Sequence, residues 1–459
     1  MLASIVNTFR NCFKIPELKS RILFTLVVLA ICRLAAVIRV PGLDGAALTD
    51  YFAKNAAKGG GGLLGMYSMF TGGALEHCAV GALGIMPYIS ATIIIQLLTA
   101  VIPQLSKLAR EEGGRPKLIQ YGRYLTVVLC LGQGLVMALG WENAASIFPG
   151  FQGKLVMYDA LWWYRFQTTI ILTTGTLLLM WLGEQITDRG IGNGVSLVIT
   201  IGILARLPQA VQGIRDSFFP AGGTEAQLNL GHAIILVALL AAVIAGVVAV
   251  TQAQRKVPVQ YAQRAVGRKV YAGGTSYMPL RVNYPGVMPI IFAQAILMFP
   301  AQILEFLGRK FGIKFFYEIA AQLHERSFWY LLIYGLMIMF FSYFWVATQF
   351  NELQIADDLK KNGGYIPGVR PGQATSGFLH NAMHRITLAG AVFLTIIAVI
   401  PILLARSMNI PYAVAQFFGG TSMLIAVGVM LDTMRQMESH LLMRHYDGFL
   451  KKGRLKGRF

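Results

Sequence analysis

Residues 81–103 read GALGIMPYISATIIIQLLTAVIP, a run that contains no charged side chain. A helix of about 20 apolar residues is long enough to cross the hydrocarbon core of a bilayer. Ser90, Thr92 and Gln96 interrupt the isoleucines of this run. Because polar groups are costly in lipid, we expect these three side chains to face protein or water. The run therefore predicts a membrane protein, and a helix with one face that is not made for lipid.

The composition of the whole chain points the same way. Hydrophobic residues make up 55% of the 459 residues and charged residues 13%, whereas soluble domains carry about 25% charged residues. Apolar runs predict ten membrane spans, at residues 22–40, 77–102, 122–140, 166–184, 193–213, 231–251, 286–307, 328–349, 386–405 and 412–436. The predicted fold class is an all-α polytopic membrane protein. Arg33 interrupts the first span, and we expect its side chain to extend toward the outer interface.

The distribution of charge predicts the orientation. The chain has 40 Lys and Arg residues against 21 Asp and Glu residues, a net charge of +19. With the N-terminus in the cytoplasm, most of the basic residues fall on the cytoplasmic side, as the positive-inside rule requires. Both termini are then cytoplasmic. The first apolar run has no clear small-residue cleavage site, so we expect it to be retained rather than removed as a signal peptide.

Four segments between or after the spans have a different character. Residues 54–65 contain KGGGGLLG and lead into MYSMFTGGALEH, a half-helix that is either re-entrant or part of a surface loop. Residues 252–283 alternate around Gly273-Gly274 and predict a β-hairpin. Residues 351–380 are rich in Gly, Pro and basic residues, and the tail at 443–459 is basic. We expect the two long loops to project into the cytoplasm and the tail to be mobile.

Motifs for catalysis are missing from the sequence. No span has paired carboxylates at its centre, a Ser/His/Asp grouping or an HExxH helix, and no GxxxxGK[ST] loop occurs. Glu76, Glu184, Glu305 and Asp432 lie near span ends, where we expect each to pair with a base or to lie at the interface. The four cysteines show no metal-binding spacing. We therefore predict no enzymatic activity, no metal and no cofactor, and an external energy source for any work against a gradient.

Two sets of isoleucines could line a path through the membrane. Ile85 and Ile89 are four residues apart, and so are Ile191, Val195 and Ile199 in turn, which places each set on one face of a helix. Aliphatic faces can close a constriction to water and ions. The same side chains could equally face lipid or pack against other helices, and spacing alone leaves both interpretations open.

The basic loops indicate a docking surface. Arg255-Lys256 and Arg268-Lys269 belong to the predicted hairpin, and Arg370 lies in GVRPG. Clustered bases bind acidic proteins or RNA phosphates, although they also satisfy topology alone. Two other functional classes remain open: a secondary transporter, which needs ionisable or carbonyl ligands at the midplane, and an intramembrane protease, which needs a catalytic grouping.

Five longer motifs resemble the SecY family, the central subunits of the bacterial Sec protein-translocation channel. They occur in the family's order, from about Arg21 to the tail, and read YSMFTGGALEHCAVGALGIMPYISATIIIQLLT, WLGEQITDRGIGNGVSLVI, GRKVYAGGTSYMPLRVN, ADDLKKNGGYIPGVRPG and FFGGTSMLIAVGVMLD.

The resemblance implies ten helices in two pseudo-symmetric five-helix halves around a central pore. The halves are residues 1–220 and 221–459, and the second carries cytoplasmic loops at 252–285 and 350–385. A short plug half-helix at about 64–75 is implied on the external side, with Leu64, Met66, Phe70, Gly72 and Gly73.

The resemblance also implies residue roles. The pore is expected to narrow at an aliphatic ring formed by Ile85, Ile89, Ile191, Val195, Ile199, Ile291 and Ile425. A lateral gate between spans two and seven is expected to carry Ser90, Thr92, Gln96 and Gln294. The implied docking residues for the ribosome and the SecA ATPase are Arg255, Lys256, Arg268, Lys269 and Arg370.

The implied function is a passive protein-conducting channel of the Sec translocon. SecA or a translating ribosome would drive unfolded secretory chains through it, and membrane-protein segments would leave laterally into the membrane. The implied partners are the small subunits SecE and SecG, SecA, the ribosome through its rRNA, signal peptides, nascent chains and anionic lipids. The implied location is the bacterial plasma (inner) membrane.

Overall fold

The computed structural model describes residues 15–57, 67–68, 70–111, 113–144, 148, 151, 153–218, 230–261, 264–266, 269–271, 274–312, 314–323, 327–407 and 421–452. The helices are α2 (Pro16–Ala35), α3 (Gly45–Ala57), α5 (Met86–Val101), α6 (Pro103–Arg110), α7 (Gly114–Glu142), α9 (Leu161–Arg189), α10 (Gly194–Leu204), α11 (Leu207–Phe218), α12 (Leu230–Gln252), α13 (Met288–Phe311), α14 (Lys314–Gln322), α15 (Phe328–Gln349), α16 (Glu352–Lys361), α17 (Gln373–Ser407) and α19 (Thr421–Lys452). The strands are β1 (Gln254–Tyr261), β2 (Arg264–Val266), β3 (Lys269–Tyr271), β4 (Thr275–Arg281) and β5 (Gly364–Tyr365).

The helices include several that can cross a membrane. By length and apolar composition, six helical stretches of the described chain qualify, and a seventh does if α5 and α6, bent by 105°, form one broken span. The six contain α7, α9, α10, α12, α15 and α17. They expose large apolar side chains such as Val128, Leu336 and Phe393, as lipid-facing surfaces do. The prediction of a mainly helical, multi-pass membrane protein is therefore confirmed.

The second predicted span, 77–102, starts too early. Helix α5 begins only at Met86, with Pro87 in its first turn, and residues 71–85 form consecutive turns instead. We call residues 71–85 the turn segment. Gly72, Gly73 and Gly84 have φ values of 63°, 88° and 59°, which glycine adopts without the steric cost that other residues incur. Hydropathy did not reveal this break, because residues 78–85 carry no charged side chain and continue the apolar run into the helix.

The turn segment is buried against the end of α2. The Val80 and Gly81 amides donate to the carbonyls of Ile38 and Ala35, both at 2.9 Å, and the Leu75 side chain is fully buried. Irregular backbone is tolerated within a membrane protein only where protein or a water-filled cavity surrounds it. Its hydrogen bonds to the α2 end meet that requirement.

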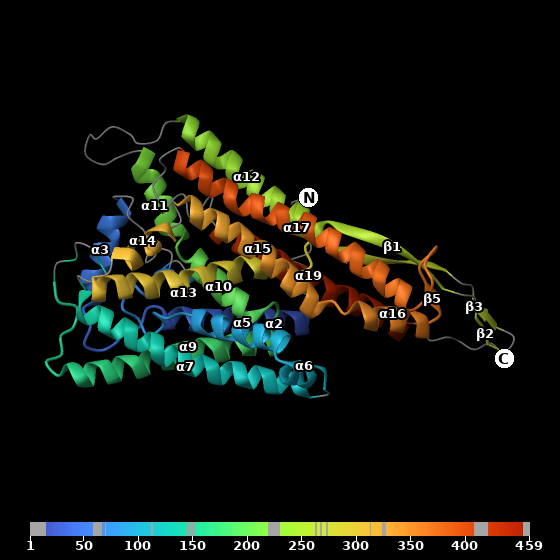
Figure 1. Cartoon of the computed structure of the whole chain (residues 1–459), viewed down its shortest axis with the longest axis horizontal. Helices are drawn as coiled ribbons and strands as arrows, with labels where there is room; N and C mark the ends of the chain where they lie inside the picture. The colour runs from blue at the N-terminus through green and yellow to red at the C-terminus, as the bar shows by residue number, and fades with distance from the viewer. Residues whose placement is uncertain are drawn as a thin grey trace.

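The helices form two groups that follow the order of the chain (Figure 1). One group contains α2, α5, α7, α9 and α10, and the other contains α12, α13, α15, α17 and α19. Contacts between the groups run through α5 against α13 and through α10 against α19. One large apolar cluster joins residues of both groups, including Trp141, Ile290 and Leu424. The two groups are therefore separate along the sequence but share a core.

The predicted hairpin is present, but it extends beyond the predicted turn. Strand β1 pairs antiparallel with β4 from Gln254↔Arg281 to Gln260↔Thr275. The short strands β2 and β3 continue the excursion, and their last pair is Val266↔Lys269. The pair Val266↔Lys269 lies further along the excursion than the predicted turn, and Gly273 of that turn lies outside the described residues.

The second long loop joins this hairpin. Strand β5 pairs with the end of β1 through Gln260↔Tyr365 and Tyr261↔Gly364. Beneath the sheet, Val257 and Val259 of β1 pack with Phe350, Leu379 and other residues at the ends of α15 and α17, in a second apolar core. The hairpin and α16 lie at one end of the molecule and α3 and α14 at the other (Figure 1). Helix α19 extends to Lys452, so the first part of the basic tail is helical.

Candidate functional site

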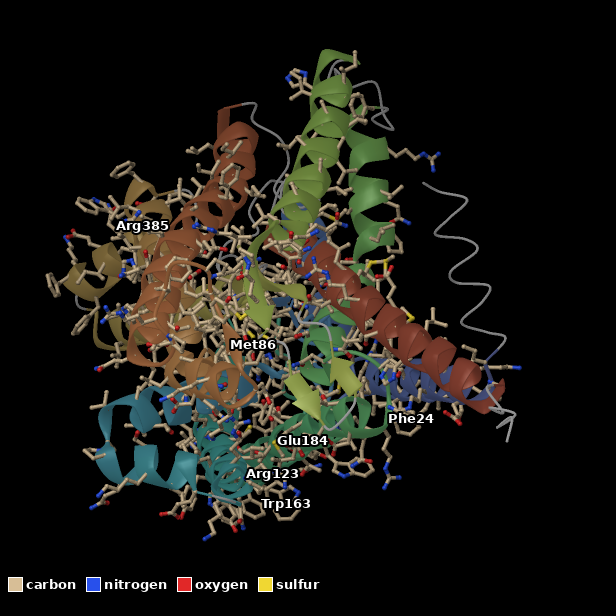
Figure 2. All side chains as sticks on the ribbon, turned by 90° about the vertical axis from the view of Figure 1, so that its right-hand side faces the viewer. Phe24, Met86, Arg123, Trp163, Glu184 and Arg385 are labelled. Atoms are coloured by element: carbon tan, nitrogen blue, oxygen red, sulfur yellow. The ribbon has the colours of Figure 1, made fainter. Side chains whose placement is uncertain are left out.

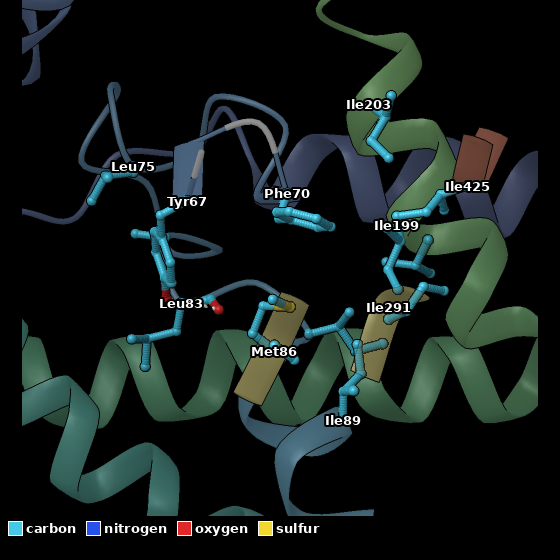
Figure 3. Packing of buried hydrophobic residues seen from close by; sticks show 14 of the residues in the cluster. Tyr67, Phe70, Leu75, Leu83, Met86, Ile89, Ile199, Ile203, Ile291 and Ile425 are labelled. Atoms are coloured by element: carbon cyan, nitrogen blue, oxygen red, sulfur yellow. Dashed lines mark hydrogen bonds between the residues drawn. The ribbon is translucent and has the colours of Figure 1, made fainter. Parts of the chain in front are cut away.

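Most of the expected ring residues lie in one apolar cluster between the two helix groups. Ile85 immediately precedes α5, Ile89 lies in its first turns, Ile199 comes from α10, Ile291 from α13 and Ile425 from α19, and each is at most 3% exposed. Figure 3 shows Ile89, Ile199, Ile291 and Ile425 gathered closely. Val195, one turn before Ile199 on α10, is half-buried and packs against the same cluster. Four helices from both groups thus supply aliphatic side chains to a single place.

Ile191 does not join this cluster. Helix α10 begins at Gly194, so Ile191 precedes the helix and the four-residue spacing does not place it on the face of Val195 and Ile199. Its side chain packs with Leu18 instead, and its amide donates to the Thr25 hydroxyl at 3.1 Å. Gly190 and Gly192, on either side of Ile191, were the sequence signal that α10 starts after Ile191 and that a loop precedes it.

The residues expected to form the plug lie partly outside the described chain, which includes neither Leu64 nor Met66. Phe70 is buried and its ring points toward the isoleucine cluster (Figure 3). Phe70 and Thr71 face Ile85, Val198 and Gly202 across a cavity of about 30 Å³, room for little more than a water molecule. Among the described residues, only this small cavity separates Phe70 and Thr71 from Ile85 and Val198.

Arg33 behaves differently from the expectation that it reaches the outer interface. Its Nη1 donates a hydrogen bond of 2.6 Å to the Gly72 carbonyl, and its side chain lines the same small cavity. A Cβ on Gly72 would lie 2.5 Å from that Nη1 and 2.8 Å from the Gly202 Cα, so only glycine fits. The expected snorkelling is replaced by a contact inside the protein.

Two carboxylates near predicted span ends pair with bases, as expected. Glu184 of α9 accepts two hydrogen bonds from Arg123 of α7, with an N···O distance of 2.8 Å in the ion pair. This pair lies toward the edge of the molecule, whereas Met86 at the start of α5 lies near its middle (Figure 2). Glu76 in the turn segment pairs with Arg206, which lies between α10 and α11, at 2.7 Å. The sequence left open whether Glu76 would pair with a base or lie at the interface, and it named no partner.

The expected lateral gate follows the contact between α5 and α13. Ser90 and Gln294 are buried, and Thr92 donates to the Ile89 carbonyl of its own helix at 2.8 Å. The side-chain oxygens of Gln96 and Gln294 are buried without a hydrogen-bond partner among the described residues. Ser90 and Gln294 therefore lie on two helices that contact each other, whereas Thr92 lies near Gly122 of α7. The two glutamine oxygens do not join the helices by hydrogen bonds.

The expected docking residues lie on the sheet and the loop that joins it. Arg255 and Lys256 are exposed on β1, and Arg370 is exposed after β5. Lys269 belongs to β3, and Arg268 lies outside the described residues. Because β5 pairs with β1, basic residues from two distant loops lie at the same end of the molecule. The two-residue strand β5 has no alternation that the sequence could have revealed.

Comparisons with known proteins agree with this arrangement. The model of the SecY family matches residues 79–434. The chain is 43% identical to the protein translocase subunit SecY of Chlamydia trachomatis serovar D, covering 98% of this chain and 99% of the relative. It is 42% identical to that of Escherichia coli strain K12, covering 96% of each chain.

Solved structures share the fold at lower identity. A SecY structure in which the plug domain stabilises the closed translocation channel has a TM-score of 0.60 at 19% identity, covering 98% of this chain and 99% of that one. Canine Sec61 in a ribosome–channel complex has a TM-score of 0.56 at 18% identity, covering 97% and 99%.

Proposed function

The chain belongs to the SecY family, and we propose that it is the protein-conducting channel of a Sec translocon. It passes unfolded secretory polypeptides across a membrane and releases membrane-protein segments laterally into it. The observation that carries this function is the aliphatic cluster of Ile89, Ile199, Ile291 and Ile425, supplied by four helices of both groups.

The chemistry of the cluster suits a seal around a moving chain. Aliphatic side chains form no directional bonds with a polypeptide, so they accept any sequence. A constriction lined by them excludes water and hydrated ions by dewetting. The channel itself performs no chemical reaction, and its partners supply the energy.

The finer architecture belongs to the same proposal. Ten spans form two halves, residues 1–220 and 221–459, and the ring lies where the halves meet. Residues 64–75 act as the plug on the external side, supported by Phe70, which points toward the ring. Helices α5 and α13 form the lateral gate, supported by their contact across the two groups and by the buried polar residues Ser90 and Gln294.

The proposed partners follow from the basic sheet. Arg255, Lys256, Arg268, Lys269 and Arg370 form a docking platform for the ribosome and for SecA. The ribosome assignment is supported by the solved complex of the structural neighbour Sec61. SecE and SecG complete the membrane assembly, and anionic lipids neutralise the basic cytoplasmic side. The location is the bacterial inner membrane with both termini in the cytoplasm.

A site-specific photo-crosslink tests the function. A photoreactive residue replaces Ile199 in the assembled complex, and a secretory chain is stalled in transit. We expect an adduct with the stalled chain that depends on a functional signal sequence. The matched control is the same probe at Val128, which is exposed on α7 away from the cluster and should give none. An assembled complex with no adduct at Ile199, Gln96 or Gln294 would overturn the assignment.

A further inference from the structure

A buried ionic group connects the plug region to the α10–α11 junction. Arg206 lies between α10 and α11, and its Nη2 is 2.7 Å from Oε1 of Glu76. Ser68 donates to the same carboxylate oxygen at 3.0 Å, and Arg206 also donates to the Ser68 hydroxyl. One guanidinium thus holds two side chains that lie on either side of Phe70 and the Gly72-Gly73 pair.

The surroundings of this group are dry. Ser68 is fully buried and Glu76 is 7% exposed, while the Arg206 side chain is 14% exposed. A buried ion pair adds little net stability over apolar packing, but removing one partner is strongly destabilising because the other charge stays buried and unpaired. The pair therefore matters chiefly for what happens when its two members separate.

A second contact holds the turn segment. Arg33 of α2 donates to the Gly72 carbonyl, and Gly72 lies against Gly202 of α10 with no space for a side chain. Ser68, Gly72 and Glu76 are thus held by polar contacts to α2 and to the α10–α11 junction.

We propose that Arg206 is a positioning residue for the plug and that its ion pair with Glu76 is a latch that holds the channel closed. The proposal rests on the plug role proposed above. In the closed state the Glu76 carboxylate is buried and accepts from both Arg206 and Ser68. When the plug leaves and water fills the pore, both charges are hydrated again. A plug that has shifted only slightly separates the two charges before water reaches them. Two buried, unpaired charges have the highest free energy of the three states, so the latch makes opening an all-or-none step.

Charge reversal distinguishes a latch from simple packing. The test uses the full complex in planar bilayers and records ion conductance without substrate. We expect Glu76→Arg and Arg206→Glu each to raise the resting conductance about tenfold or more, because each places two like charges in a buried site. Glu76→Gln, which keeps the size of the side chain, should give a smaller rise of the same sign. The double reversal, Glu76→Arg with Arg206→Glu, should return to within about threefold of the parent, because the pair is restored.

The matched control is the other Glu–Arg pair near the external end. Arg165 of α9 binds Glu142 of α7 at 2.8 Å, away from the plug, and Glu142→Arg should leave the resting conductance unchanged. Adding a stalled secretory chain to every variant shows whether it assembles into a working channel. The latch proposal would be overturned if the single charge reversals had the resting conductance of the parent. It would also be overturned if the double reversal conducted as much as the single reversals. A parent complex that no secretory chain opens would refute the channel function, and the latch with it.

Discussion

At the scale of single residues, the ring and the close helix contacts depend on side-chain size. Ile89 and Ile94 lie five positions apart on α5, yet Ile89 is buried in the cluster and Ile94 is 38% exposed on the outside. The same substitution at the two positions therefore separates an effect on the seal from an effect on the helix.

Ile89→Asn should make the resting channel leak ions, because an amide in the constriction binds water where an aliphatic group repels it. Ile94→Asn serves as the control and should keep the parent conductance. Single-channel recording without substrate gives the measurement. Equal conductance for Ile89→Asn and the parent would count against the ring.

Gly175 of α9 tests the packing of the turn segment. A Cβ there would lie 2.2 Å from the Val80 carbonyl oxygen, and relieving such an overlap typically costs about 1–3 kcal/mol. Gly175→Ala should therefore lower the midpoint of thermal unfolding in detergent. Gly132→Ala on α7 meets nothing within 4 Å and should leave the midpoint unchanged or raise it, since alanine favours helix.

At the scale of elements, hydrophobic periodicity predicted the regular helices and strands but not the irregular turns between them. The alternation of β1 identified the hairpin, and long apolar runs identified the helices. The late start of α5 and the position of Ile191 were not predicted, because turns formed by glycines within an apolar sequence do not interrupt its high hydropathy. The partnership of Glu76 with Arg206 escaped for another reason: the two lie 130 positions apart, and only the folded chain brings them together.

The pairing of β5 with β1 predicts that the two long loops unfold as one unit. Val257 is 3% exposed in the small core under the sheet, so Val257→Asp buries a carboxylate there. If the buried carboxylate lowers the free energy of local unfolding by about 3 kcal/mol, amide exchange should become roughly a hundredfold faster. In Val257→Asp we expect faster amide exchange in both residues 254–281 and residues 364–366. The control Gln254→Asp alters an exposed position of the same strand and should leave the exchange rates unchanged. Acceleration confined to residues 254–281 would show that the loops are independent.

At the scale of the whole molecule, the hairpin end and the end with α3 and α14 should lie on opposite sides of the membrane. Lys154 precedes α9 and Tyr277 lies on β4, and both are exposed. In a variant whose native cysteines are replaced by serine, Lys154→Cys should react with an impermeant maleimide in cells with a permeable outer envelope. Tyr277→Cys should react only after the inner membrane is opened. The reverse pattern would invert the orientation.

The joined loops have a mechanical consequence. The sheet is attached to α12, α13, α15 and α17, which all follow residue 229. Among the described residues, its strands pair only with one another, in the order β4-β1-β5. A partner that binds the sheet is thus connected directly to the helix group that follows residue 229. A force applied to the sheet acts across the contacts of α5 with α13 and of α10 with α19, so a motor could separate the two helix groups without touching the aliphatic cluster.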